Sequence, residues 1–157
     1  VDEWALAQAR VIELVAPLTT EQAAVRVPAC PDWTVRDLFS HMVGLGADVV
    51  AGDEPDDHNP VWTQMQVATR RDHDIAALVT EWEGISGRLR EWMREHGTRP
   101  LSDVIIHEQD LRGALGAPGG RDSGGVRAVR DRFLPRLAAR VEGLPPIGLV
   151  LVMIGRL

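Results

Sequence analysis

The stretch DHDIAALVTEWEGISGRLREWMRE, residues 72–95, decides the fold. Its apolar residues recur at alternating spacings of three and four, at Ile75, Leu78, Val79, Trp82, Ile85, Leu89 and Trp92. This spacing is typical of a long helix that packs against other helices in a left-handed bundle. Gly97 and Pro100, which follow the stretch, are residues that end helices. The stretch therefore predicts one long helix inside a helical bundle.

Weaker apolar stripes on both sides predict the remaining helices. One runs over residues 2–18, and a second runs to about Val50 behind Thr34, which has Asp37 three residues later as an acidic capping box. Thr63 is predicted to cap the next helix along the chain. Ser102 is predicted to cap a helix that ends near residues 115–116, and a fifth helix covers residues 126–141 with a kink at Pro135. We therefore expect an all-α fold, an antiparallel four-helix bundle with one additional C-terminal helix.

The end of the chain has a different pattern. The segment 149–154 is rich in β-branched residues and follows Pro145 and Pro146, so it reads as a β-strand. A single strand cannot stand alone, so either it pairs with another chain in a homodimer or it opens a further domain. The expected organisation is a helical bundle over residues 1–142, followed by a linker and strand over residues 143–157.

Composition limits the classes of function. The chain has 157 residues, a size typical of one domain, and a net charge of -6, which argues against a nucleic-acid partner. No apolar run is long enough to span a membrane and no signal peptide is visible, so we expect a cytoplasmic protein without a membrane partner. The single cysteine, Cys30, cannot form an internal disulfide. All 17 basic residues are arginine, which excludes lysine-based chemistry such as a Schiff base.

Three side chains suggest a metal site. His41 lies between Leu38 and Leu45 on the apolar stripe of its helix, so it should point inward. Asp103 and His107 are four residues apart and therefore share one face of another helix. Two imidazoles and a carboxylate form a three-ligand metal site with room for an exogenous fourth ligand.

Asp110 lies one turn beyond His107 and can accept the second ring proton of a metal-bound imidazole. The same residues also have a structural interpretation, which stays open at this point. Asp103 can decorate a helix N-terminus, and both histidines can be ordinary core residues.

Two segments carry a resemblance to a known family. The segment from Pro28 to His41, with Cys-Pro-x-Trp-Thr-Val-Arg-Asp-Leu, and the segment from Asp103 to Gly116 resemble the two metal motifs of the mycothiol-dependent maleylpyruvate isomerase family, actinobacterial type. That family is a branch of the DinB-like helical bundles. The resemblance implies a metal held by His41, Asp103 and His107. Asp103 stands where the maleylpyruvate isomerases have glutamate, so we expect the shorter side chain to be the least firmly placed ligand.

The resemblance also implies a cofactor and a reaction class. The expected cofactors are a divalent metal, zinc with nickel or another ion as alternatives, and the thiol mycothiol. A thiol that binds the metal loses its proton and attacks a small electrophile, so the expected activity is isomerisation or S-transfer. Glu108 and Asp110 are the candidates for proton transfer.

Two other functions compete with this expectation. One is a non-catalytic DinB-like metal-binding helical module that can be dimeric. The other is an iron oxygenase, because two histidines and one carboxylate also suit iron.

Overall fold

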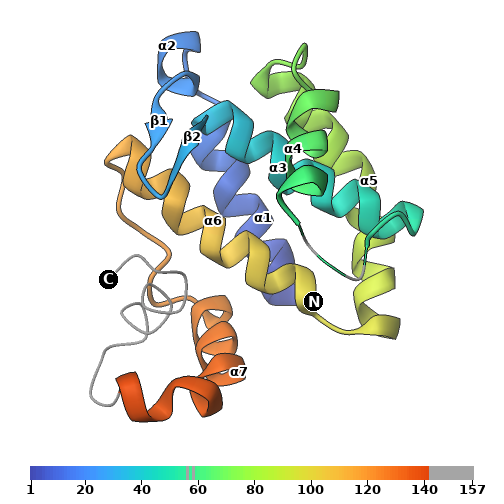
Figure 1. Cartoon of the computed structure of the whole chain (residues 1–157), viewed down its shortest axis with the longest axis vertical. Helices are drawn as coiled ribbons and strands as arrows, with labels where there is room; N and C mark the ends of the chain where they lie inside the picture. The colour runs from blue at the N-terminus through green and yellow to red at the C-terminus, as the bar shows by residue number, and fades with distance from the viewer. Residues whose placement is uncertain (56, 58, 142–157) are drawn as a thin grey trace.

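Four helices form a closed bundle in the computed structural model (Figure 1). The structure describes residues 1–55, 57 and 59–141, except for the side chains of residues 136–141. They are α1 (Asp2–Val15), α3 (Val35–Ala51), α5 (Ile75–His96) and α6 (Arg99–Leu115). Helix α3 packs against α5 and α6, and α1 packs against the same two helices. The predicted all-α four-helix architecture is confirmed.

The core of the bundle is built around Trp82 of α5. Its side chain is 1% exposed and meets Trp4 and Phe39 edge to face, with ring centroids 5.9 and 5.4 Å away. Such edge-to-face pairs suit the charge distribution of aromatic rings. Ile75, Leu78 and Leu89 continue the buried stripe of α5 as the apolar spacing predicts. Helices α3 and α6, which carry the candidate ligands, pack against each other in this bundle.

A small antiparallel hairpin precedes α3. It consists of β1 (Arg26–Val27) and β2 (Cys30–Thr34), and it follows the short helix α2 (Thr20–Ala23). The helical stripes of the sequence do not predict this hairpin, although Cys30 and Pro31 belong to β2. Strands this short carry too little alternation to be recognised in a sequence. Because β2 runs directly into α3, the hairpin sits at the edge of the bundle beside the start of that helix (Figure 1).

Some predicted helix ends are confirmed. The hydroxyl of Thr34 accepts from the backbone N–H of Asp37 at 3.1 Å, and the Asp37 carboxylate accepts from the backbone N–H of Thr34 at 3.0 Å. This reciprocal pair is the predicted capping box. Helix α6 ends at Leu115 with Gly116 in the left-handed region at φ 61°, where glycine avoids the strain of a side chain.

Two predicted caps are wrong. Helix α4 (Pro60–Thr69) is capped by Asn59, whose side chain accepts from the N–H of Trp62, and Thr63 lies inside the helix. Asparagine followed by proline is itself a strong helix start, because proline needs no N–H partner there. Ser102 also lies inside its helix, since α6 begins three residues earlier at Arg99.

The chain continues beyond the bundle into α7 (Gly124–Val141), which packs against α6 and α1. Pro135 lies within α7 as predicted, and the helix begins two residues before the predicted start. Residues 142–157, with the predicted strand and domain boundary, lie outside the described residues. Among the helices that are described, none combines the length and the apolar character that crossing a bilayer requires.

Candidate metal centre

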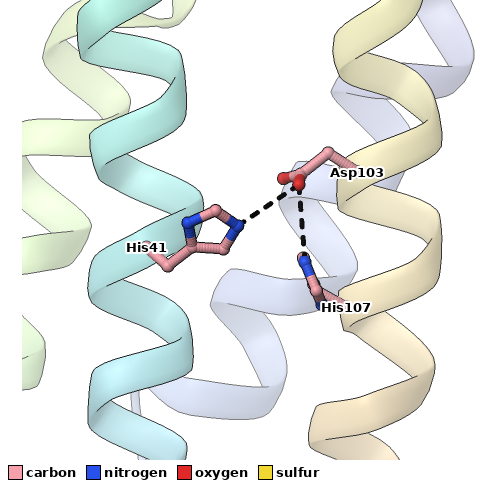
Figure 2. Close-up of side chains that lie close together, drawn as sticks. All are labelled: His41, Asp103 and His107. Atoms are coloured by element: carbon pink, nitrogen blue, oxygen red, sulfur yellow. Dashed lines mark ion pairs between the residues drawn. The ribbon is translucent and has the colours of Figure 1, made fainter. Parts of the chain in front are cut away.

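The three predicted ligands come together between two helices. His41 projects from α3 toward α6, and Asp103 and His107 project from α6 toward α3, as Figure 2 shows. The capping box at Thr34 sets the start of α3, and Asp103 and His107 lie one turn apart on α6. The spacing argument made from the sequence therefore holds in three dimensions.

Asp103 lies between the two imidazoles. Its Oδ1 atom is 3.5 Å from Nε2 of His41 and 3.4 Å from Nε2 of His107. One ligand atom from each residue lies within 4.8 Å of the other two, and the histidine rings are 5.2 Å apart. The three atoms therefore converge on one small volume.

The cluster is mostly buried but keeps an open side. His41 is 5% exposed, whereas the side chains of Asp103 and His107 are 18% and 15% exposed. A fully enclosed group would suit a purely structural role. The partial exposure at α6 leaves an approach from solvent for a small molecule.

The electrostatics of the cluster are strongly coupled. Burial opposes the charged form of His107, but the charge of Asp103 and the hydrogen bonds that the ring donates to Asp103 and Asp110 outweigh it and raise the pKa of His107 from 6.5 to about 9. Burial likewise opposes ionisation of Asp103, but the charge of His107 and hydrogen bonds from His107 and His41 hold its pKa below the ordinary 3.8. Without a cation, the cluster therefore keeps a proton on His107 and a negative charge on Asp103 at neutral pH.

Asp110 contacts the other side of the His107 ring. Its Oδ2 atom accepts from Nδ1 of His107 at 3.0 Å, and its side chain is 2% exposed. This contact is the arrangement expected from the sequence for Asp110. It places the proton of the neutral ring on Nδ1 and directs Nε2 into the cluster.

Gln66 of α4 contacts Nδ1 of His41, as Asp110 contacts Nδ1 of His107. Its Oε1 atom lies 2.7 Å from Nδ1 of His41, and its Nε2 donates to Oδ2 of Asp48 at 2.7 Å. Neither Gln66 nor Asp48 was singled out from the sequence. Their role depends on where α4 packs, and local spacing does not reveal that.

Trp33 of β2 covers the His41 ring. Its ring centroid is 5.1 Å from that of His41, and its indole N–H donates to Oε1 of Gln64 at 3.3 Å. Trp33 also lines a surface hollow of about 240 Å³ between β2 and the start of α4. A larger hollow of about 530 Å³ is lined by Thr34, Asp37 and Asp74 among others. None of the three ligand residues lines either hollow, and the smaller one adjoins the cluster only through Trp33.

Glu108 lies apart from this chemistry. Its carboxylate is fully buried and accepts hydrogen bonds from Arg10 at 2.8 and 2.6 Å and from Arg112 at 3.1 Å. One residue step along a helix turns a side chain by about 100°, so Glu108 faces α1 while His107 faces α3. Both oxygens of Glu108 are therefore engaged by guanidinium groups, in a buried ion-pair network with Arg10 and Arg112.

The donor set fits a divalent transition metal. Two imidazole nitrogens and one carboxylate oxygen suit zinc, nickel and iron, and both outer ring nitrogens already have acceptors. The negative charge of Asp103 would partly neutralise a cation, which would take the place of the proton now on His107. The His41, Asp103 and His107 group can therefore hold a metal.

Comparison with known proteins gives one family. The model of the mycothiol maleylpyruvate isomerase N-terminal domain matches residues 4–112, a span that includes the complete candidate metal centre and most of the chain. No curated protein sequence and no solved structure matches the chain. The chain therefore belongs to the family of the mycothiol maleylpyruvate isomerase N-terminal domain.

Proposed function

We propose that the chain is a metal-dependent, mycothiol-dependent enzyme that isomerises a small electrophilic substrate or conjugates it to the thiol. The observation that carries the proposal is the convergence of His41, Asp103 and His107 in a member of this family. In the isomerase version, a maleyl-type substrate leaves as its trans isomer. In the transferase version, it leaves as the S-conjugate.

Each ligand residue has a distinct task in this proposal. His41 and His107 present their Nε2 atoms, and Asp103 supplies the negative charge that attracts the cation. Asp110 keeps the second ring nitrogen of His107 occupied, so that ring cannot turn. A bound divalent ion would lower the pKa of a neighbouring thiol and so supply a thiolate at neutral pH.

The surroundings suit a small electrophile. The cluster is open beside Asp103 and His107, and Trp33 forms an apolar wall over His41. The hollow of about 240 Å³ next to Trp33, lined also by Cys30, Pro31 and Thr63, has room for a molecule of a few carbon atoms. We propose that the substrate lies there.

The test combines metal analysis with an activity assay. The purified chain is loaded with zinc or nickel, analysed for metal by elemental analysis, and assayed with mycothiol and a maleyl-type substrate. We expect one metal per chain and thiol-dependent conversion, both lost in His41→Ala. His96→Ala is the matched control, because His96 is exposed and stacks on Trp92 at the end of α5. If wild type binds metal but converts no electrophile in the presence of the thiol, the enzymatic proposal is wrong.

One observation favours a second function, that of a non-catalytic helical module. Asp103 pairs with both histidines in the absence of a cation, so the cluster is electrostatically compensated by itself. A module of this kind would gain thermal stability from a metal and show no thiol chemistry. The same metal analysis and assay separate the two functions, and bound iron in place of zinc or nickel would instead favour an oxygenase.

A further inference from the structure

One face of α3 is built to receive another helix beside the metal centre. His41, Gly44 and Asp48 are spaced by three and four residues and therefore lie in one row along α3. The residue in the middle of the row has no side chain. A Cβ atom at Gly44 would lie 2.5 Å from Cβ of Gln66 and 2.9 Å from Nη1 of Arg70, closer than atoms can approach. The gap at Gly44 therefore lets α4 sit directly on α3.

Gln66 fills this gap and joins the two ends of the row. It is 3% exposed, with its oxygen 2.7 Å from Nδ1 of His41 and its nitrogen 2.7 Å from Oδ2 of Asp48. A buried side-chain amide with both ends bonded has a fixed orientation, and leaving either end unpaired would cost free energy.

The direction of each hydrogen bond in the series His41–Gln66–Asp48 follows from the chemistry of Asp48. An ionised carboxylate only accepts hydrogen bonds, so the atom of Gln66 that faces Asp48 is its NH₂ group. The oxygen of Gln66 then faces His41, and Nδ1 of His41 must carry a proton to donate to it. With Nδ1 donating to Gln66, Nε2 is the ring nitrogen left to bind a metal; without a metal it faces Oδ1 of Asp103 at 3.5 Å.

We propose that Gln66, oriented by Asp48 and seated by Gly44, is a positioning residue that keeps the Nε2 lone pair of His41 directed at the metal. This inference rests on the metal site proposed above. It also gives the two histidines different supports, a neutral amide for His41 and a carboxylate for His107. Helix α4 is held in place for this task, because Arg70 donates to Glu81 of α5 at 2.6 Å and to the backbone oxygen of Gln66 at 3.2 Å.

The direct test reads the tautomer of His41 in the wild-type chain. Nitrogen-15 NMR of the metal-free protein, recorded across a pH series, distinguishes a protonated from an unprotonated ring nitrogen. We expect Nδ1 of His41 to carry a proton, because it faces the oxygen of Gln66, and an unprotonated Nδ1 would overturn the inference. This measurement needs no bound metal and no variant. If the wild type failed to bind metal, the proposed function would fail, but the tautomer would still decide the inference.

A second test measures metal affinity by titration of the metal-free protein with zinc. Gln66→Leu should weaken binding about 10- to 100-fold, the usual effect of removing a partner of a metal-bound histidine. The matched control is Gln8→Leu, because Gln8 is also buried and donates to the backbone oxygen of Trp82 on the far helix. Equal affinities for the two variants would contradict the role of Gln66.

A rescue experiment separates positioning from simple packing. Gln66→Glu alone places two carboxylates together and removes the donor to Asp48, so affinity should fall. Adding Asp48→Asn restores one donor and one acceptor at that contact, so the double variant should bind zinc more tightly than Gln66→Glu. No gain in the double variant would contradict the proposed order of hydrogen bonds.

The seat at Gly44 gives a last comparison. Gly44→Ala should lower zinc affinity because α4 must move away from α3. Gly87→Ala in α5, where a Cβ would meet nothing within 4 Å, should leave zinc affinity unchanged. Wild-type zinc affinity in Gly44→Ala would show that the closeness of α4 does not matter to the site.

Discussion

Oδ1 of Asp103 lies 3.4 Å from Nε2 of His107, one turn away along α6. This pair raises the pKa of His107 to about 9, so the ring is protonated at neutral pH when no cation is bound. The proton occupies the nitrogen that a metal would need. Metal binding and proton binding are therefore in competition at the same atom.

The first prediction follows from this competition. Near pH 7, zinc binding should release close to one proton per chain, because His107 loses its proton while Asp103 is already ionised, and the number should fall as the pH approaches 9. The apparent affinity should rise about tenfold per pH unit and level off above pH 9. Calorimetric titrations in buffers of different ionisation enthalpy measure the proton count. An affinity that stays flat across this range would contradict the raised pKa.

The second prediction concerns the stability of the metal-free chain. The raised pKa of His107 contributes stability that is complete below its unfolded value of 6.5 and is lost as the pH rises through about 9. The lowered pKa of Asp103 contributes stability that is present above 3.8 and is lost as the pH falls. Thermal unfolding with a chelator should therefore give a higher midpoint at pH 6 than at pH 9. Asp103→Asn should shrink that difference, and an undiminished difference in this variant would place its origin elsewhere.

The third prediction isolates Asp110. Asp110→Asn keeps an acceptor near Nδ1 of His107 but removes the charge, so zinc affinity should fall about 10- to 100-fold with one metal still bound per chain. Asp131→Asn is a suitable comparison, since the Asp131 side chain is 60% exposed and pairs with its neighbour Arg130. Zinc titration of both variants checks this. Equal affinities would mean that Asp110 does not support the site.

The fourth prediction concerns Glu108, whose replacement should lower stability and leave zinc affinity unchanged. Glu108→Gln leaves two guanidinium groups facing a neutral amide in a buried position, so the free energy of unfolding should drop by about 3 kcal/mol. Zinc affinity should stay near that of wild type, because Glu108 faces α1. Urea unfolding and zinc titration measure the two effects. A loss of zinc affinity without a loss of free energy of unfolding would show that Glu108 takes part in the metal site.

Much of the fold was predictable because it depends on local periodicity. The stripe through Leu78 and Trp82 identifies α5, and the pair Thr34 and Asp37 marks the start of α3 without knowledge of any other helix. The hairpin was not predictable, since a two-residue strand at Arg26–Val27 has no period to detect. The start of α6 was placed too late because Ser102 resembles a cap, whereas helix entry at Arg99 relies on Pro100 in the first turn.

The candidate site divides in the same way. The apolar stripe of its helix predicts that His41 points inward, and the four-residue spacing predicts that Asp103 and His107 share one face. Asp110 also followed from spacing, since it lies one turn from His107. Gln66 could not be found, because its contact with His41 joins two helices that only tertiary packing brings together.

The most direct test of the account is a crystal structure of the zinc-soaked chain, recorded at wavelengths on both sides of the zinc absorption edge. The central claim is that one metal ion binds between α3 and α6. It predicts a single anomalous peak about 2.0–2.2 Å from Nε2 of His41, Nε2 of His107 and a carboxylate oxygen of Asp103. A chain that crystallises with zinc in solution and shows no peak among these three residues, or shows it elsewhere, would contradict the claim.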